Sequence, residues 1–551
     1  MSTSPITNSV SMIGDDAPRS AGDVTTKETT LCRNGILKSI NHGKEVNGSM
    51  SANGPREMAI NGMLKCMQEM REDVLEQVND RINHMMSELR QRIEKEEEDP
   101  SKENKYDDKR QSNKEGVLPN KVFLPRNSLL TDLLEIPHIQ TVYNICLMTF
   151  ILLFLDTIAH DLMDTGTLFI GTYTVQKAFA KFPTCLYIWS FMKISTLALY
   201  VPFNIWAYQR LEFVLKSLFQ KIWDYVWLIT FISYQVLFVV LPIKALLNEN
   251  LPVACSVALI MEQLRLMMKS HAFIRSVGAK FVSYKPHTET PKPSSPGFSH
   301  YLYFLFAPTL VYSDSYPRTK VVRWKAVFRN FIEVGMVIFY IAFIMERFVA
   351  PTFHVFGTKP LNWRWYVKNI FGMMMPGILI CVSSFYCLLH AWMNAWAEML
   401  RFADRLFYKD WWNCTTYRAY YRTWNVVVHD WLYTYVYKDM YEIVSPRNKV
   451  LATYAVFFIS SVFHEYILAF TFRFFYPVML IMFGGLGFVL IFNKRSASNV
   501  FMWTSLCIGN GIMIGLYGIE YYARINCLPN DDKYLDLILP RSWSCRPVSG
   551  G

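Results

Sequence analysis

One histidine lies inside an apolar run that is long enough to form a membrane-spanning helix. The run LATYAVFFISSVFHEYILAF, residues 451–470, contains His464. Ionisable side chains are rare in such segments and usually mark a functional site. A neutral imidazole, with an unperturbed pKa of about 6.5, can accept a proton from an alcohol near neutral pH. His464 is therefore the candidate general base, although a histidine that only hydrogen-bonds to a neighbouring helix fits the same sequence.

Polar residues in the preceding turns follow the same stripe of this helix. Lys449, Thr453 and Ser460 fall in line with His464 at 100° per residue. At about 1.5 Å per residue, Lys449 stands at one end and His464 lies roughly 22 Å deeper. This pattern predicts the wall of a tunnel that leads to the histidine. Glu465 points elsewhere, and we expect it to act at most as a supporting partner.

A second polar stripe lies upstream, in the unusually aromatic residues 395–449. This stretch is too polar to cross a bilayer and too aromatic for an ordinary loop, so we expect helices at the water–lipid boundary. If residues 421–437 form one helix, its polar side chains share about a third of the circumference. They are Arg422, Asn425, His429, Tyr433 and Tyr437. This face suits a ligand with phosphates and amides, such as coenzyme A, and the alternative is an interfacial helix that meets water.

Other catalytic motifs are missing from the sequence. It has no GxSxG elbow and no reactive-cysteine setting, so direct transfer without a covalent intermediate is the simpler scheme. The 11 cysteines show neither CxxC pairs nor zinc spacing. We therefore predict no metal or redox cofactor.

The elements that must position these residues are membrane helices. Of the 551 residues, 52% are hydrophobic and only 18% are charged, with long uncharged runs from Thr141 onward. A helix needs roughly 20 residues to cross a bilayer. We predict an all-α, polytopic fold with about nine spans, near 140–160, 185–206, 223–247, 251–268, 327–348, 366–392, 449–472, 474–493 and 499–521. Glu262 and Arg265 interrupt the fourth span, and we expect them to face protein or water.

The distribution of charged residues predicts which ends of the membrane helices face the cytosol. The net charge of +11 resides largely at the ends of apolar segments and in their connections, as in membrane proteins that keep basic loops in the cytosol. This placement argues against nucleic-acid binding. Without a recognisable signal peptide, the N-terminus is predicted to be cytosolic. Nine spans then put the C-terminus on the opposite side, where Cys527 and Cys545 could oxidise.

The hydrophilic N-terminal part is predicted to contain separate segments. Residues 1–60 are predicted to be a disordered cytosolic tail. Residues 61–100 have the spacing of an amphipathic helix with a stripe between Met67 and Leu89. Self-association is our preferred interpretation, and a helix on the membrane or on the body of the chain is the alternative. A linker at 101–128, a membrane-embedded domain at 129–525 and a C-terminal segment at 526–551 follow.

Three motifs resemble one family. FYxDWWN is formed by Phe407, Tyr408, Asp410, Trp411, Trp412 and Asn413. With YYRTWNVVVHDWLY at 420–433 and HEY at 464–466, it resembles the membrane-bound O-acyltransferase superfamily, specifically its sterol O-acyltransferase branch. FYxDWWN also occurs in diacylglycerol acyltransferases, so it does not identify the acceptor. YLYFLFAPTLVYSDSYPRT at 301–319 and RSWSCR at 541–546 resemble the sterol branch, and the similarity covers about 129–546.

The resemblance implies roles for individual residues. His464 would be the catalytic histidine, and Asn425 would stabilise charge on the thioester carbonyl. The residues expected to contact acyl-CoA are Arg422, Asn425, His429, Tyr437, Lys449 and Ser460. His138 matches a histidine near a sterol site, and Cys527 would pair with Cys545 in a lumenal disulfide. Ala419 replaces an expected Asn, which puts one CoA contact in doubt.

The implied reaction transfers a long-chain acyl group from acyl-CoA to the 3β-hydroxyl of a sterol, giving a sterol ester and CoA. The resemblance further implies an endoplasmic reticulum membrane protein with a lumenal C-terminus that forms a homodimer or homotetramer. The alternatives are a diacylglycerol or other alcohol acyltransferase on the same scaffold and, more remotely, a lipid transporter or lipid-binding protein.

Overall fold

The computed structural model describes residues 64, 67–68, 118–166, 171–285, 291–358, 362–492 and 498–546. The chain divides into two compact units, Met1–Asn113 and Lys114–Gly551, and almost all described residues belong to the second. The predicted disordered tail at 1–60, nearly all of the predicted amphipathic helix at 61–100 and most of the linker at 101–128 lie outside the described residues.

Long apolar helices dominate the second unit. Within the residues that the structure describes, seven helical segments are long and apolar enough to cross a membrane. They are Pro137–Asp164 in α4 (Pro137–Thr165); Phe182–Glu212 in α6 (Phe182–Ala198) and α7 (Tyr200–Glu212); α8 (Leu218–Asn248); Trp324–Phe353 in α11 (Trp324–Ile344), η1 (Met345–Val349) and α12 (Ala350–Phe353); Trp363–Met399 in α13 (Trp363–Gly372), α14 (Met374–Phe385), η2 (Tyr386–Trp392) and α15 (Met393–Met399); α18 (Lys449–Phe472); and α20 (Asn499–Asn526).

Shorter elements and one long charged helix complete the described part. They are α3 (Leu129–Leu133), α5 (Thr172–Ala178), α9 (Val253–Ser283), α10 (Phe298–Phe306), η3 (Trp411–Asn413), α16 (Tyr417–Thr423), α17 (Val426–Leu432), η4 (Tyr433–Tyr437), η5 (Met440–Val444), η6 (Leu480–Gly487), α19 (Phe488–Ile491), α21 (Lys533–Ile538) and η7 (Arg541–Trp543). Within the described ranges the only β pairing consists of isolated bridges. The predicted all-α class is confirmed.

The predicted number of nine spans is not established. The fourth predicted span, 251–268, lies in α9, and the eighth, 474–493, corresponds to a short apolar helical stretch at Leu480–Ile491. Neither is among the segments that are long and apolar enough to cross a membrane. In α9 the physical reason is its charge, because Glu262, Arg265 and Lys269 lie within two helical turns.

The charges of α9 face protein, as expected for Glu262 and Arg265. The Glu262 carboxylate pairs with Lys193 of α6 at 2.5 Å and with Arg265 at 2.7 Å. The ammonium of Lys269 donates to the carbonyl oxygens of Phe304 and Ala307 at 2.5 and 2.7 Å. These carbonyls end α10, where the helix dipole favours a cation. Buried charges need such partners, so α9 is an internal helix that fastens α6 and α10.

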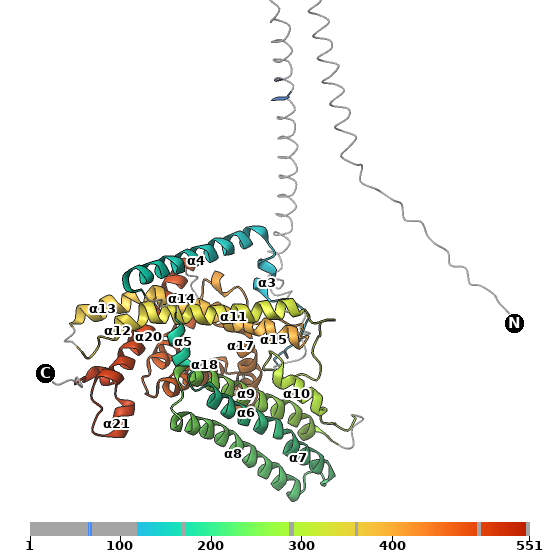
Figure 1. Ribbon diagram of the computed structural model, residues 1–551. Helices are drawn as coiled ribbons and strands as arrows, with labels where there is room; N and C mark the ends of the chain where they lie inside the picture. The colour runs from blue at the N-terminus through green and yellow to red at the C-terminus, as the bar shows by residue number, and fades with distance from the viewer. Residues whose placement is uncertain are drawn as a thin grey trace, which may run out of the picture. The chain divides into compact units, whose positions relative to one another are not determined.

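Helix α18, which carries His464, lies within the bundle. It packs against α9, against η4 and η5, and against η6. Figure 1 shows α6, α8 and α9 side by side on one flank of the unit and α4 along the opposite flank beyond α11. Helix α18 is therefore packed against elements from three separate stretches of the chain.

Candidate active site

A backbone hydrogen bond orients the His464 ring. The His464 Nδ1 atom lies 2.7 Å from the carbonyl oxygen of Ser460, one helical turn earlier. A carbonyl oxygen can only accept, so Nδ1 must carry the proton, and the neutral ring keeps its lone pair on Nε2. The ring is exposed on α18, and Phe483 of η6 lies beside it. His464 is thus oriented to accept a proton at Nε2.

Glu465 does not support His464. Its carboxylate accepts hydrogen bonds from the Leu480 N–H at 3.0 Å and from the Tyr517 hydroxyl at 3.1 Å. Both partners lie away from the histidine, because consecutive side chains of a helix point about 100° apart. The carboxylate thereby fastens the start of η6 to α18. The expectation of a supporting partner for His464 is wrong for this residue.

Helix η6 approaches α18 and α16 closely at two glycines. A Cβ atom at Gly484 would lie 2.7 Å from Ser461 Oγ, and one at Gly487 would lie 2.5 Å from Tyr421 Oη. Real Cβ atoms do not approach other atoms that closely, so only glycine fits without a shift. No role was predicted for these glycines, although the run FGGLG at residues 483–487 of an apolar segment was a visible signal.

The close approach places an aromatic side chain beside the candidate base. Phe483 of η6 lies 5.2 Å from the His464 ring and 5.3 Å from the Tyr421 ring, measured between centroids. Tyr421 also packs on Phe457 of α18 at 5.1 Å. This aromatic group connects α16 to the histidine and was not predicted from the sequence.

Asn425 breaks the helix that was predicted for residues 421–437. It is the N-cap of α17, with φ −138° and ψ 89°, and its Oδ1 accepts a hydrogen bond from the Val428 N–H at 3.1 Å. Asparagine is strongly preferred at this position because its side chain satisfies a free N–H of the first turn. The prediction of one continuous helix is wrong. The cap fixes Oδ1, so the amide NH₂ of Asn425 is held as a hydrogen-bond donor.

Beyond this break the predicted polar face is present as a stacked ladder. The rings of His429 and Tyr433 are 6.4 Å apart at 8°, those of Tyr433 and Tyr437 5.7 Å at 15°, and those of Tyr437 and Tyr441 6.0 Å at 6°. The π-helical turns η4 and η5 are wider than α-helical turns. Residues spaced by four therefore stay on one face. The π turns were not predicted.

Arg422 belongs to the same region. Burial and the neighbouring Tyr441 raise the pKa of the Tyr437 hydroxyl, and the positive charge of Arg422 acts in the opposite direction. That opposing influence indicates that the guanidinium lies near the ladder. Arg422 is exposed, so its charge is accessible to a ligand.

The helical stretch α17, η4 and η5, which carries the ladder, is attached to α9 by its opposite face. Trp431 Nε1 donates to the Met268 carbonyl at 2.9 Å, the Tyr435 hydroxyl lies 2.8 Å from Ser276 Oγ, and Asp439 pairs with Arg275 at 2.9 Å. These attachments again recur every four residues. They turn the His429–Tyr441 ladder away from α9 and hold it rigidly.

Lys449 and Ser460 lie where the helical stripe predicted them. Lys449 is the first residue of α18 and is exposed. Ser460 contributes its carbonyl oxygen to His464, and its hydroxyl lies 3.5 Å from Nδ1. Their proposed contact with acyl-CoA is not tested by these positions. Ala419 lies in α16, where its N–H donates to Thr416 Oγ1 at 3.2 Å.

The FYxDWWN motif forms the scaffold beneath α16 and α17. Phe407, Tyr408 and Trp411 are buried, whereas Asp410 and Asn413 are exposed. The Val426 N–H donates to the Phe407 carbonyl at 2.9 Å. The rings of Trp411 and Trp424 lie 4.5 Å apart, and the Trp412 carbonyl accepts from Asn499 Nδ2 at 2.7 Å. The motif thus contacts both neighbours of Asn425, Trp424 and Val426, and so fixes the position of the Asn425 cap.

A buried histidine, His390, supports this scaffold. Nδ1 of His390 lies 2.7 Å from the Tyr408 hydroxyl. Ser128 Oγ and Asn394 Nδ2 each lie 3.3 Å from the same nitrogen. His390 was missed, although it shows the signal used for His464, a histidine within an apolar run.

His138 occupies a different part of the bundle. It is exposed on the first turn of α4, which packs on α11 through Phe150 and Tyr340 at 5.2 Å. Among the described residues, no hydrogen bond or ring contact joins His138 to His464. Its role at a sterol site stays a prediction.

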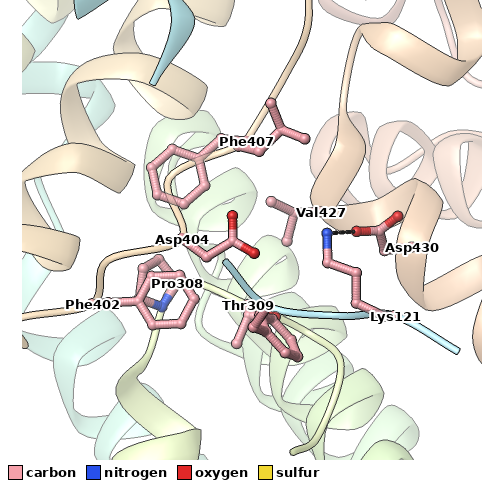
Figure 2. A pocket seen from close by; sticks show the side chains of 10 residues that line it. Lys121, Pro308, Thr309, Phe402, Asp404, Phe407, Val427 and Asp430 are labelled. Carbon is pink, nitrogen blue, oxygen red and sulfur yellow. Dashed lines mark ion pairs between the residues drawn. The ribbon is translucent and has the colours of Figure 1, made fainter. Parts of the chain in front are cut away.

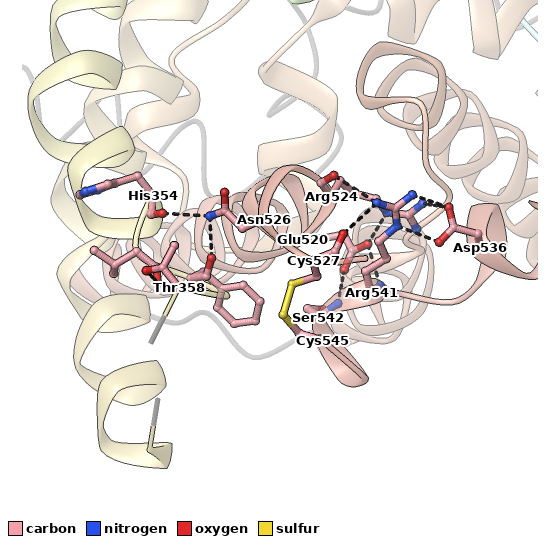
Figure 3. The surroundings of a disulfide bond; sticks show 12 residues. His354, Thr358, Glu520, Arg524, Asn526, Cys527, Asp536, Arg541, Ser542 and Cys545 are labelled. Carbon is pink, nitrogen blue, oxygen red and sulfur yellow. Dashed lines mark hydrogen bonds and ion pairs between the residues drawn. A yellow bond between two sulfur atoms is a disulfide. The ribbon is translucent and has the colours of Figure 1, made fainter. Parts of the chain in front are cut away.

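Cys527 and Cys545 are joined by a disulfide, with Cα atoms 5.3 Å apart. Figure 3 shows the ion pairs around it, in which Arg541 pairs with Asp536 at 2.6 Å. The Arg541 and Ser542 N–H groups donate to Glu520 of α20, each at 3.0 Å. The C-terminal segment is therefore held at the end of α20 by the disulfide and by the two hydrogen bonds to Glu520.

Metal-binding clusters are not found in the part of the chain that the structure describes. No group of three or more His, Cys, Asp and Glu side chains is placed there to hold an ion. The His464 region in particular offers one imidazole, with Ser460 and Phe483 beside it.

Comparisons with known proteins show which family the chain is similar to. Residues 176–519 match the model of the membrane-bound O-acyltransferase family. The chain is 43% identical to sterol O-acyltransferase 1 of Mus musculus, over 78% of this chain and 80% of that protein. It is 39% identical to sterol O-acyltransferase 2 of Homo sapiens, over 77% and 80% of the two chains.

Proposed function

The chain belongs to the membrane-bound O-acyltransferase family, and from this premise we propose that it transfers a fatty acyl group from acyl-CoA to the hydroxyl of a sterol. The products are a sterol ester and CoA. Similarity to sterol O-acyltransferases 1 and 2 over most of the chain supports this acceptor. The observation that carries the mechanism is the Ser460 carbonyl on His464 Nδ1, which leaves Nε2 available as a base.

The reaction begins with proton removal from the sterol. Nε2 of His464 accepts the hydroxyl proton while the oxygen attacks the thioester carbonyl carbon. Negative charge develops on the carbonyl oxygen, and the capped Asn425 donates a hydrogen bond to it from Nδ2. Such a preorganised donor typically contributes about 10²–10³ in rate. The carbon–sulfur bond then breaks, and the imidazolium returns its proton to the CoA thiolate.

The acyl-CoA site extends from His464 toward Lys449. The ladder rings of His429, Tyr433 and Tyr437 offer flat surfaces and hydroxyl groups for the adenine and the amide-bearing arm. Exposed cations at Arg422 and Lys449 suit the phosphates of the nucleotide. A helix length of roughly 22 Å between Lys449 and His464 leaves room for the extended arm. Ser460 is the remaining proposed contact with acyl-CoA, and it would lie near the thioester.

The sterol approaches from the lipid with its 3β-hydroxyl first, and the acyl group is a long chain that lies within the membrane. His138 is proposed to contribute to a sterol site on α4.

The chain is a multi-pass membrane protein. We place it in the endoplasmic reticulum, with the N-terminus in the cytosol and the C-terminus, including the Cys527–Cys545 bond, in the lumen. The assembly is proposed to be a homodimer or homotetramer.

An acceptor panel tests the proposal. Purified protein is supplied with radiolabelled oleoyl-CoA and either cholesterol, diacylglycerol or no acceptor, and lipid products are separated by chromatography. Labelled sterol ester is expected with cholesterol, and none with the His464→Ala variant. Triacylglycerol as the main product would identify a diacylglycerol acyltransferase instead. Absence of any ester with all acceptors would favour lipid binding or transport.

A further inference from the structure

A short segment that precedes α4, residues 118–126, lies along α17, η4 and η5, the helical stretch that carries the ladder. The Leu118 N–H donates to Glu442 Oε1 at 2.9 Å, Asn120 Oδ1 accepts from Lys438 Nζ at 2.6 Å, and Lys121 Nζ pairs with Asp430 Oδ2 at 2.6 Å. Asp430, Lys438 and Glu442 each directly follow a ladder residue in sequence. We call residues 118–126 the strap.

The other end of the strap is anchored to the loop that carries the FYxDWWN motif. Arg126 pairs with Asp404 at 2.7 Å, and its N–H donates to the Ala403 carbonyl at 2.9 Å. Phe123 packs on Tyr316 with ring centroids 5.0 Å apart. The strap therefore joins the motif loop to α17, although it lies far from both in the sequence.

The strap covers a small cavity between these elements. The cavity measures about 20 Å³, room for about one water molecule. Figure 2 shows Lys121 and Asp430 paired on one side of it, with Asp404 and Phe407 on the other. An ion pair beside such a small space has little freedom to rearrange.

Asp430 lies between the strap and the ladder. One of its oxygens pairs with Lys121, and the other lies 3.7 Å from Nδ1 of His429. Burial alone would raise the pKa of the Asp430 carboxyl, but the facing His429 ring and the Lys121 ammonium outweigh it and lower that pKa. The carboxylate thus stays ionised and faces the first ring of the ladder.

We propose that Lys121 is a positioning residue for acyl-CoA binding, which acts through Asp430 on the His429 imidazole and on the first turn of α17. This inference rests on the proposed function. Lys121 does not touch the reacting atoms, so its loss acts on the affinity for acyl-CoA more than on the chemical step. The sterol, which arrives from the lipid, is unaffected.

The test compares Lys121→Met, Asp430→Asn and the double variant by steady-state kinetics. Each single change is expected to raise the KM for acyl-CoA roughly threefold to tenfold. The kcat stays within about twofold, and the KM for sterol does not change. The double variant should be no worse than either single one, because both remove the same interaction. Lys121→Arg should restore the wild-type KM.

A matched control uses an ion pair elsewhere. Lys280 and Asp314 form a similarly short ion pair, at 2.5 Å, that is more exposed than the Lys121–Asp430 pair, and Lys280→Met should leave the KM for acyl-CoA unchanged. An unchanged KM in Lys121→Met, or a joint loss of kcat and thermal stability without rescue by Arg, would overturn the inference. If the wild-type protein makes no sterol ester, the proposed function fails. In that case, the affinity of the same variants for acyl-CoA, measured by calorimetry, still decides whether Lys121 contributes to acyl-CoA binding.

Discussion

Nδ1 of His464 is bound to the carbonyl oxygen of Ser460 at 2.7 Å, so the backbone of the same helix sets the tautomer of the candidate base. In many enzymes a carboxylate performs this task. Here the nearby carboxylate of Glu465 is bound to Leu480 and Tyr517 instead. A neutral backbone partner orients the ring without adding a charge in a low-dielectric surrounding.

The first prediction concerns His464. His464→Ala should reduce sterol ester formation by at least about 10²-fold, because the general base is lost. The exposed ring leaves little cavity behind, so the thermal midpoint should change little. Ser460→Ala is the matched control. It keeps the orienting carbonyl and should affect the KM for acyl-CoA more than kcat. Substantial turnover in His464→Ala would remove this residue from the mechanism.

The second prediction separates the two functions of Asn425. Asn425→Asp keeps an oxygen that can accept from the Val428 N–H but removes the NH₂ donor. The kcat should fall by about 10²–10³ while the protein stays folded. Asn448 caps α18 in the same way through the Leu451 N–H, and Asn448→Asp should leave kcat near the wild-type value. A pure KM effect in Asn425→Asp would mean that the amide only binds acyl-CoA.

The third prediction concerns the contact between η6 and α18. In Gly484→Ala the new Cβ would meet Ser461 Oγ at 2.7 Å. The resulting shift should cost about 1–3 kcal/mol, lower the thermal midpoint and reduce activity by displacing Phe483 from His464. At the neighbouring Gly485 a Cβ meets nothing within 4 Å, so Gly485→Ala is the control. Equal behaviour of the two variants in a thermal unfolding assay would contradict the close packing.

The fourth prediction concerns the disulfide. Its cysteines are 18 positions apart, and in the chain-entropy model such a loop contributes about 3 kcal/mol. Cys527→Ala should lower thermal stability by less than that, because the Arg541 side chain also holds the segment by donating from Nη1 to the Arg524 carbonyl of α20 at 3.1 Å. Cys527→Ala combined with Arg541→Met should destabilise more than the sum of the single changes. Simple additivity in the unfolding midpoints would mean that the two contacts act independently.

The sequence determined the features that depend on local periodicity. Long apolar runs predicted the helices of a membrane protein, because span length follows from bilayer thickness. The spacing of Ser460 and His464 predicted a shared stripe, and their hydrogen bond is a contact of residues four apart in one helix. The spacing of His429, Tyr433 and Tyr437 likewise predicted a common face.

Only the tertiary structure decided how these stripes meet. A single asparagine cap separates α16 from α17, and periodicity does not reveal whether an Asn caps a helix or continues it. Phe483 reaches His464 because two glycines let η6 approach. Asn120 binds Lys438 across 318 positions. Such contacts depend on the packing of segments that are distant along the chain, and no local pattern in the sequence encodes that packing.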